Sequence, residues 1–294
     1  MNSLEVKSVT KIIKNKKILN NISLEANDGQ VVGLIGPNGS GKSTLFKVIT
    51  NIYNPTIGKV FVDNIDLQKE YEKISSEIGF LIEEPSLYEN LTGKENLMLI
   101  SKLYNKFDSN IFEEVCNELE INKFLNVRFN KCSMGMKQKI GIAAAIIHNP
   151  KYIILDEPTN SLDAESIIKF KRLIKTLATR GKTIILSSHI LSDVEEICDK
   201  IYILQNGEII DCINNQENKH CIQYLIYTEK FNLRIDQIPI IEKDGQKVLI
   251  VKEEQLNDIL NMLSRNNIRI FKIQEKRNTL QEKFIERIGY NECD

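Results

Sequence analysis

Short apolar runs recur along the first two thirds of the chain. They occupy residues 31–35, 59–62, 78–81, 152–155 and 183–186. Runs of this length, bounded by turn residues, predict buried strands. Longer helical patterns separate several of them, and this alternation predicts an α/β sheet whose ligand binds beyond the carboxyl ends of the strands. Two segments near the N-terminus, 4–13 and 17–26, have no helix between them and predict an antiparallel β portion.

One of the helical patterns runs from residue 164 to residue 180. Its apolar residues recur at steps of three and four, which places them on one helical face; they are Ile167, Phe170, Ile174 and Leu177. Charged residues occupy the remaining surface, and Gly181 marks the C-terminal end. The pattern therefore predicts an amphipathic helix that ends at this glycine.

The pattern changes after residue 213. Residues 214–219 are polar and rich in turn formers, without apolar periodicity, which predicts a linker. The remainder predicts a small α/β unit, with strands at 224–228, 247–251 and 268–273 and helices at 255–265 and 280–288. We therefore divide the chain into a first domain of residues 1–213, a linker of residues 214–219 and an accessory domain of residues 220–294.

The composition is that of an ordinary globular protein, with 294 residues of which 42% are hydrophobic. The 39 basic and 40 acidic residues leave a formal charge of −1, which indicates neither a nucleic-acid-binding surface nor an anchor for anionic membranes. The longest stretch without a charged residue, 29–41, is shorter than the roughly 18–20 apolar residues that a spanning helix needs. The N-terminus has no signal-peptide pattern, so we predict a cytoplasmic protein without a membrane span.

The six cysteines form no Cys-x-x-Cys pair. Because a cytoplasmic location keeps thiols reduced, no disulfide framework is expected. Cys212, His220 and Cys221 lie close together in the sequence, but a fourth ligand at a recognised spacing is missing. We therefore predict no zinc site.

A glycine-rich loop follows the apolar run at 31–35 and opens an amphipathic segment. It comprises Gly36, Pro37, Asn38, Gly39, Ser40, Gly41, Lys42, Ser43 and Thr44. A phosphate loop requires this context, because its backbone N–H groups and the helix N-terminus point at negative charge. Lys42 would bind the β and γ phosphates, and Ser43 would ligate Mg²⁺. Taken alone, the glycines could also make an ordinary tight turn between strand and helix.

Two acids, Asp156 and Glu157, end the apolar run at 152–155. This position places Asp156 near the Mg²⁺ and Glu157 beside the γ-phosphate, where its carboxylate can polarise the attacking water. Solvated acids at the end of a strand are the alternative for this pair alone. Together with the phosphate loop, the pair indicates nucleotide hydrolysis.

A third motif lies about 20 residues before the acid pair. It comprises Ser133, Met134, Gly135, Met136, Lys137 and Gln138. At a helix N-terminus, Ser133 and Gly135 would offer a hydroxyl and amides to an anion, although an ordinary N-cap has the same residue types. The segment resembles the ABC signature, usually written Leu-Ser-Gly-Gly-Gln, with Cys132 in the leucine position and a methionine, Met134, in place of the first glycine. Met136, followed by Lys137, stands where glutamine is usual.

The order of motifs makes the resemblance specific, because the phosphate loop, Q-loop, signature, acid pair, D-loop and switch histidine of ABC ATPases all have counterparts here. The D-loop counterpart is Ser161, Leu162 and Asp163, with Ser161 where glycine is usual, and the switch histidine is His189. The resemblance covers residues 1 to about 213. It implies a P-loop ABC ATPase with a RecA-like core, an antiparallel β subdomain and a helical subdomain. It also implies an ATP-bound homodimer, or a pair with a related ATPase, in which each phosphate loop faces the other subunit's signature.

Glu83 departs from the family pattern, because the Q-loop usually has a glutamine that touches Mg²⁺ and the transport partner. A carboxylate can still ligate Mg²⁺ and orient water, but it adds a charge and loses the amide donor. The stretch 83–97 resembles the ATPases of bacitracin-resistance and lantibiotic-immunity exporters, which often have glutamate here. A neutral exchange in a solvated loop is the alternative. Ile13 falls where many family members stack adenine on an aromatic ring, which predicts modest discrimination between ATP and GTP.

The sequence therefore predicts a subunit that hydrolyses ATP with Mg²⁺ and drives a separate membrane permease from the inner face of the cell membrane, for export of a peptide antibiotic or lantibiotic. The predicted catalytic residues are Glu157, His189 and Glu83, and the predicted metal ligands are Ser43, Asp156 and Glu83. A non-transport ABC ATPase that acts as a clamp in translation or repair is the alternative, although one cassette within 213 residues is unlike those proteins. A regulator without turnover would be expected to lack Glu157.

Overall fold

The structure of the protein is a computed structural model, and it describes residues 3–104, 106–215, 222–231, 238–243 and 245–277. The chain divides into two compact units, Met1–Ile213 and Asn214–Asp294, which we call unit 1 and unit 2. Most of the predicted linker at 214–219 lies outside the described residues. The predicted last helix at 280–288 lies outside them entirely.

Unit 1 begins with a four-stranded sheet in the order β2-β1-β4-β5. Its strands are β1 (Ser3–Ile13), β2 (Lys16–Asn27), β4 (Ile57–Val62) and β5 (Ile65–Asp66). All neighbouring pairs are antiparallel, which confirms the antiparallel β portion. The apolar run at 59–62 was grouped with the strands of the α/β sheet, but it forms β4, which pairs with β1 in this antiparallel sheet. A short apolar run does not indicate which sheet it joins.

The second sheet of unit 1 has six strands in the order β10-β9-β3-β8-β7-β6. They are β3 (Val31–Ile35), β6 (Ile78–Leu81), β7 (Tyr152–Leu155), β8 (Thr183–Ser187), β9 (Lys200–Gln205) and β10 (Glu208–Asn214). Pairing is parallel from β9 through to β6, so the carboxyl ends of β3, β7 and β8 meet at one edge. Four predicted strands lie in this sheet, and the α/β class is confirmed.

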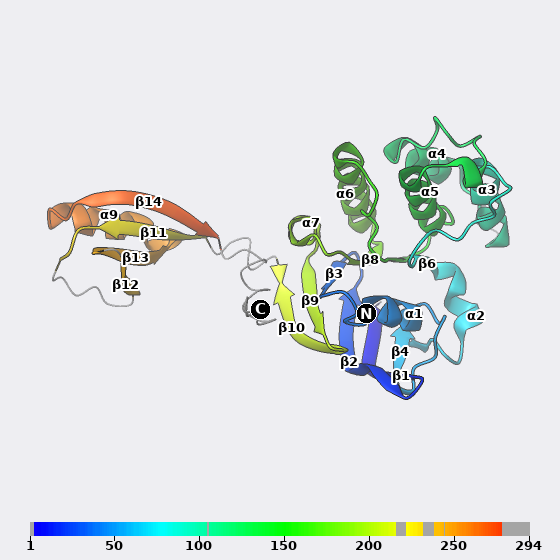
Figure 1. Ribbon diagram of the computed structural model, residues 1–294, viewed down its shortest axis with the longest axis horizontal. Helices are drawn as coiled ribbons and strands as arrows, with labels where there is room; N and C mark the ends of the chain where they lie inside the picture. The colour runs from blue at the N-terminus through cyan, green and yellow to red at the C-terminus, as the bar shows by residue number, and fades with distance from the viewer. Residues whose placement is uncertain (1–2, 105, 216–221, 232–237, 244, 278–294) are drawn as a thin grey trace. The chain divides into compact units, whose positions relative to one another are not determined.

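Helix α1 (Lys42–Ile49) follows β3 and lies between the two sheets (Figure 1). Its Leu45, Phe46 and Ile49 side chains are fully buried, in one apolar cluster with strand residues such as Val60 and Ile154. Full burial of a side chain of this size contributes about 1.5–3 kcal/mol. The core therefore fixes the helix that begins at the glycine-rich loop.

The remaining helices of unit 1 form a helical region and flank the parallel sheet (Figure 1). They are α2 (Tyr71–Ile74), α3 (Gly93–Leu103), α4 (Ser109–Glu118), α5 (Met134–Ile146), α6 (Ala164–Thr179) and α7 (Leu191–Ile197), with 3₁₀ turns at Ser75–Glu77 and Phe129–Lys131. Helix α6 buries Phe170, Ile174 and Leu177 and is followed by Gly181 at φ +81°, so the predicted helix and its glycine end are confirmed.

Unit 2 is an antiparallel sheet with one packed helix. Its elements are β11 (Ile222–Thr228), β12 (Ile240–Lys243), β13 (Gln246–Lys252), α9 (Glu253–Arg265) and β14 (Ile270–Arg277), and the strand order is β12-β13-β11-β14. Leu249 and Val251 of β13 pack with Ile259 and Leu263 of α9 in a separate apolar core. The three strands and the helix at 255–265 predicted here are therefore present, with small shifts at their ends.

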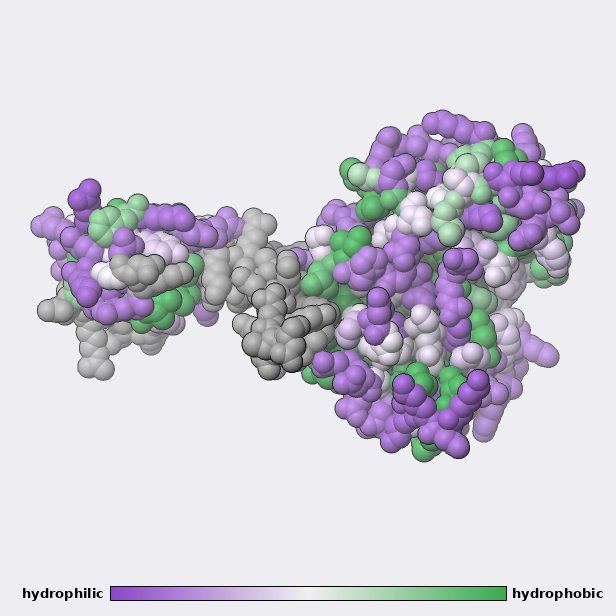
Figure 2. All heavy atoms as spheres, in the orientation of Figure 1, coloured by the Kyte–Doolittle hydropathy of each residue, from purple (hydrophilic) through white to green (hydrophobic). Residues whose placement is uncertain are grey.

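None of the helices in the described part of the chain combines the length and apolar character that a membrane crossing requires. The face of unit 1 seen in Figure 2 is largely hydrophilic, and its hydrophobic residues form separate patches.

Candidate functional site

The glycine-rich loop wraps around the ammonium group of Lys42. Lys42 Nζ donates hydrogen bonds to the carbonyl oxygens of Gly36, at 2.8 Å, and Pro37, at 3.3 Å. Gly41 caps α1 with φ +111°, a conformation that favours glycine. The Ser40 hydroxyl is buried and has no hydrogen-bond partner. A buried donor without a partner is costly, so this loop is built to bind an additional acceptor such as a phosphate oxygen.

The acid pair is held by the strands on either side of β7. The Asp156 N–H donates to the Leu81 carbonyl at the end of β6, at 2.7 Å. Ser187, the last residue of β8, donates its hydroxyl to Asp156 Oδ1 at 2.6 Å and accepts the Glu157 N–H at 2.8 Å. This one hydroxyl therefore fixes both acids. Ser187 belongs to none of the predicted motifs, and its sequence signal is its position at a strand end, two residues before His189.

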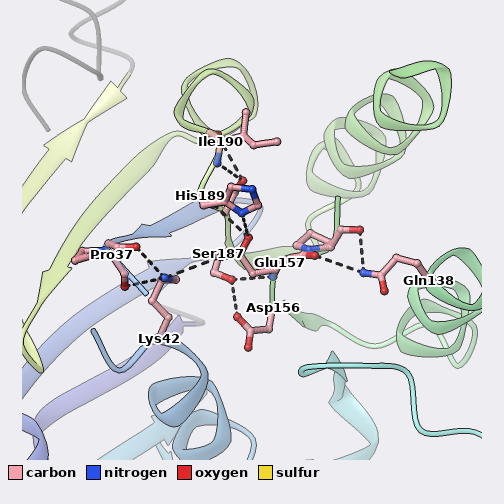
Figure 3. Close-up of polar contacts among 11 residues, drawn as sticks. Pro37, Lys42, Gln138, Asp156, Glu157, Ser187, His189 and Ile190 are labelled. Carbon is pink, nitrogen blue, oxygen red and sulfur yellow. Dashed lines mark hydrogen bonds and ion pairs between the residues drawn. The ribbon is translucent and has the colours of Figure 1, made fainter. Parts of the chain in front are cut away.

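Glu157 lies between a cation and an imidazole (Figure 3). Its Oε1 is 4.0 Å from Lys42 Nζ. Its Oε2 lies 2.7 Å from His189 Nδ1 and accepts the His189 backbone N–H at 3.2 Å. The structure thus brings together Lys42, Asp156, Glu157, Ser187 and His189, which we call the phosphate-site cluster.

Glu83 pairs with a lysine that the sequence analysis did not identify. Lys47 Nζ lies 2.6 Å from Glu83 Oε1, and this hydrogen bond raises the pKa of Lys47 against the opposing effect of its burial. Among the described residues, no hydrogen bond or ion pair joins Glu83 to Ser43 or Asp156. The structure therefore places this loop carboxylate against α1, and its role at a metal stays a prediction.

The signature segment begins α5, and Ser133 is its N-cap, accepting the Met136 N–H at 3.3 Å. A Cβ on Gly135 would lie 2.7 Å from the Ser161 carbonyl, so only glycine permits this approach of the signature to the D-loop. Gln138 donates to the carbonyls of Pro158, at 3.1 Å, and Glu157, at 3.4 Å. The signature helix is therefore tied to the D-loop and acid pair of its own chain.

The other predicted residues of these two segments are less buried. Met134 is 52% exposed, and Lys137 Nζ lies 5.3 Å from the centre of the Phe129 ring. Asp163 caps α6 by accepting the Ser166 N–H at 2.8 Å, and the side-chain hydroxyl of Ser166 followed by this N–H lowers the pKa of its carboxyl. These contacts lie within one chain and account for local structure, and the contacts of both segments with nucleotide stay a prediction.

The predicted Mg²⁺ ligands fit a hard cation in their chemistry. A serine hydroxyl and the buried Asp156 carboxylate are oxygen donors of the kind that Mg²⁺ prefers. The described residues contain no group of three or more His, Cys, Asp or Glu side chains that could hold a metal alone. Mg²⁺ usually keeps waters and phosphate oxygens among its ligands, so a site with few protein ligands agrees with a nucleotide-bound ion.

The Glu83 loop also lines a groove with a volume of about 420 Å³, which we call the Q-loop groove. Its walls include Lys47 of α1, Pro85 of the loop, Leu103 of α3 and His148 after α5. A neighbouring cavity of about 560 Å³ shares the residues 84–87 with it and extends to the start of α5. The loop therefore lines two neighbouring surface depressions.

Comparison with known proteins gives several similarities. A family model described as "ABC transporter" matches residues 19–160. The chain is 32% identical to an uncharacterized ABC transporter ATP-binding protein, YdbJ, of Bacillus subtilis, over 96% of this chain and 94% of the relative. It is 30% identical to the bacitracin transport ATP-binding protein BcrA of Enterococcus faecalis, over 97% and 96% of the two chains.

Two further similarities cover about 70% of the chain. The chain is 36% identical to the lantibiotic transport ATP-binding protein SrtF of Streptococcus pyogenes, over 70% of this chain and 89% of the relative. An ATP-binding cassette solved as a dimer in a post-hydrolysis state, with ADP and Pi bound, has a TM-score of 0.67 and 30% identity. That likeness covers 72% of this chain and 98% of the solved one.

Proposed function

Because this chain belongs to the ABC transporter family as an ATP-binding, ATP-hydrolysing subunit, we propose that it powers export of a peptide antibiotic through a separate membrane permease. The observation that carries the catalytic part is the phosphate-site cluster, in which Glu157 contacts His189 and lies 4.0 Å from Lys42. The names of two relatives, a bacitracin and a lantibiotic transport protein, support the choice of cargo.

In this proposal Lys42 exchanges its bonds to the Gly36 and Pro37 carbonyls for the β and γ phosphates of ATP. Glu157 polarises the attacking water as a general base. His189 orients the Glu157 carboxylate through the 2.7 Å contact and reaches the γ-phosphate. Ser187 keeps both acids in position by its two hydrogen bonds.

Ser43, Asp156 and Glu83 would hold Mg²⁺, which when bound neutralises negative charge on the phosphates. Asp156 suits this role because it is 4% exposed and Ser187 occupies one of its two carboxylate oxygens. Its second oxygen can then face the cation. Glu83 is 60% exposed and held by Lys47, so it would join this set only after moving.

A second subunit completes each nucleotide site in this proposal. Within one chain, the first turn of α5 is partly exposed and contacts its own D-loop. Residues 133–138 would therefore bind the γ-phosphate held by the partner's phosphate loop, as an anion at a helix N-terminus. Either a second copy of this chain or a related ATPase could supply the partner surface.

The permease would dock in the Q-loop groove, whose largely apolar walls suit a partner helix. Through this contact the ATPase would lie at the inner face of the cell membrane. Movement of the Glu83 loop would then connect nucleotide binding to the permease, since the same loop lines the groove and pairs with α1.

The transport part can be tested by isolating the tagged chain from its native membranes. Co-purification of a multispan membrane protein is the expected result, whereas recovery of ribosomes alone would contradict transport and favour the clamp alternative. Cells that express the pair should tolerate bacitracin or a lantibiotic better than cells that express the permease with a Glu157→Gln subunit. Equal tolerance of both strains would reject this cargo while leaving the ATPase assignment in place.

A further inference from the structure

Lys47 is held more firmly than the carboxylate it contacts. Its side chain is 21% exposed and its Nζ lies 5.6 Å from the centre of the Tyr53 ring. Its carbonyl accepts the Tyr53 N–H at 2.8 Å, which fixes the backbone at the end of α1. The Glu83 side chain is 60% exposed, in a loop. Of the two partners, Lys47 is therefore the fixed point and Glu83 the group that can change position.

The backbone at Glu83 is constrained independently of this ion pair. Its φ of +61° lies in the left-handed region, which costs a residue with a side chain about 1 kcal/mol and is kept only where the surroundings require it. Glutamine and glutamate have the same side-chain length, so both bear a similar cost at this φ. Exchange of Glu83 for glutamine therefore changes the charge and leaves the loop geometry matched.

Lys47 lies on α1, the helix that begins at Lys42 of the phosphate loop. Its ammonium group already pairs with Glu83 Oε1, and it repels a divalent cation that approaches the same carboxylate. Two cations that bind one carboxylate therefore oppose each other.

We propose that Lys47 is a positioning residue that competes with Mg²⁺ for the Glu83 carboxylate and so sets the Mg²⁺ requirement for nucleotide binding. The Glu83 carboxylate is held with Oε1 at 2.6 Å from Lys47 Nζ, so it must move away from this ammonium to join Ser43 and Asp156 at a metal. Lys47 thereby holds the loop against α1 until the metal and nucleotide offer a stronger partner. This inference rests on the proposed metal role of Glu83, and the experiment separates the two.

The experiment measures equilibrium binding of a fluorescent, non-hydrolysable ATP analogue to the full chain while Mg²⁺ is titrated. Lys47→Met keeps most of the side-chain volume and removes the charge. It is expected to lower the half-saturating Mg²⁺ concentration about threefold, the size of effect known for partly exposed ion pairs. Lys47→Arg, which keeps the charge, should stay close to the parent chain.

Two controls identify the partner through which Lys47 acts. In a Glu83→Gln background, Lys47→Met should leave the Mg²⁺ requirement unchanged, because the competing carboxylate is absent. Lys59→Met removes a lysine that also forms an ion pair with an acid, with its Nζ 2.8 Å from Asp66 Oδ2, outside the phosphate-site cluster. This variant should leave the Mg²⁺ requirement unchanged. Lys47→Gln serves as a second neutral variant if the methionine variant does not fold.

The outcomes separate this inference from the metal proposal. Glu83→Ala removes both the charge and the oxygen ligand; if it fails to raise the Mg²⁺ requirement, the metal role of Glu83 is wrong and this inference falls with it. If Glu83→Ala raises the requirement but Lys47→Met does not lower it, only the competition is wrong. An equal shift by Lys47→Met in both backgrounds would show that Lys47 acts through another group and would overturn the proposal.

Discussion

The two units differ in what they bury. At the edge of its parallel sheet, unit 1 buries polar side chains that include Lys42, Asp156 and Ser187. Unit 2 has an apolar core under α9, and its buried polar residues within the described ranges are Asn215 and Thr228. Burial of polar and charged groups costs free energy unless they are paired, so such a cluster persists where the chemistry requires it. The contrast assigns hydrolysis to unit 1, whereas the described residues of unit 2 bury mainly apolar side chains.

The largest expected effect is on hydrolysis, from a change within the phosphate-site cluster. Glu157→Gln keeps the shape of the side chain but removes the general base, so the rate of phosphate release should fall about 10²–10⁴-fold. ATP should then accumulate in stable dimers, visible by size-exclusion chromatography. Glu254→Gln, an exposed acid in the first turn of α9, is the control in unit 2 and should hydrolyse ATP normally. Unchanged hydrolysis in Glu157→Gln would remove this residue from the role of base.

A matched pair of core truncations sharpens the comparison between the units. Leu249→Ala removes a fully buried side chain from unit 2, and Leu34→Ala removes one that is 1% exposed from unit 1. Each should cost about 2–5 kcal/mol of the unit's stability, since each leaves a cavity. In thermal melts followed by circular dichroism, Leu249→Ala should lower the transition of unit 2 while ATP hydrolysis stays within about twofold. Loss of hydrolysis in both variants would contradict a purely packing role for unit 2.

His148 is a buried polar side chain of unit 1 outside the phosphate-site cluster, and it tests the limits of the comparison. It is 2% exposed, stacks on Tyr104 at 4.1 Å between ring centres, and contacts the Ile78 carbonyl through Nε2 at 3.4 Å. Burial is the main cause that lowers its pKa to about 4. The hydrogen bond with the Ile78 carbonyl and the charge of Glu77 oppose this shift, and the positive charges of Lys106 and Lys182 add to it.

This depressed pKa makes unit 1 sensitive to acid. Between pH 6.5 and about 4 the unfolded chain binds a proton at His148 that the folded chain does not, so stability falls as the pH falls. The loss should reach about 3 kcal/mol, by 1.36 kcal/mol for each pKa unit. Urea unfolding at several pH values measures it, and His148→Phe, which keeps the ring stack, should remove this part of the pH dependence. The same slope in His148→Phe would assign the acid sensitivity to other groups.

The smallest expected effect concerns the base of the nucleotide. Ile13→Tyr places an aromatic ring where the family commonly stacks adenine, and should tighten ATP binding by about 0.5–1.5 kcal/mol. Nucleotide titration of the variant and of the parent chain measures this difference. Ile12→Tyr, on the opposite face of β1, is the control and should not bind ATP more tightly. In the parent chain, a hundredfold preference for ATP over GTP would contradict the modest discrimination expected from an aliphatic side chain.

Local pattern was sufficient for the parts of the fold that depend on neighbouring residues. The phosphate loop is recognisable because a strand, glycines and a helix follow one another within residues 31–49. The amphipathic helix α6 and the strands β3, β7 and β8 were predicted from periodicity for the same reason. Short apolar runs look alike in every sheet, however, so only the structure shows that β4 pairs with β1.

The sequence by itself determined the ABC ATPase class, because its motifs are contiguous residue patterns in a fixed order. The tertiary structure decided which side chains meet. Lys47 reaches Glu83, Ser187 bridges Asp156 and Glu157, and Gly135 lies against the Ser161 carbonyl. The partners in these contacts are separated by about 26–36 positions in the chain. The residues around each partner form no local pattern from which the other partner could be predicted. Hydrogen bonds and ion pairs at such separations depend on how the sheet and helices pack, which no motif encodes.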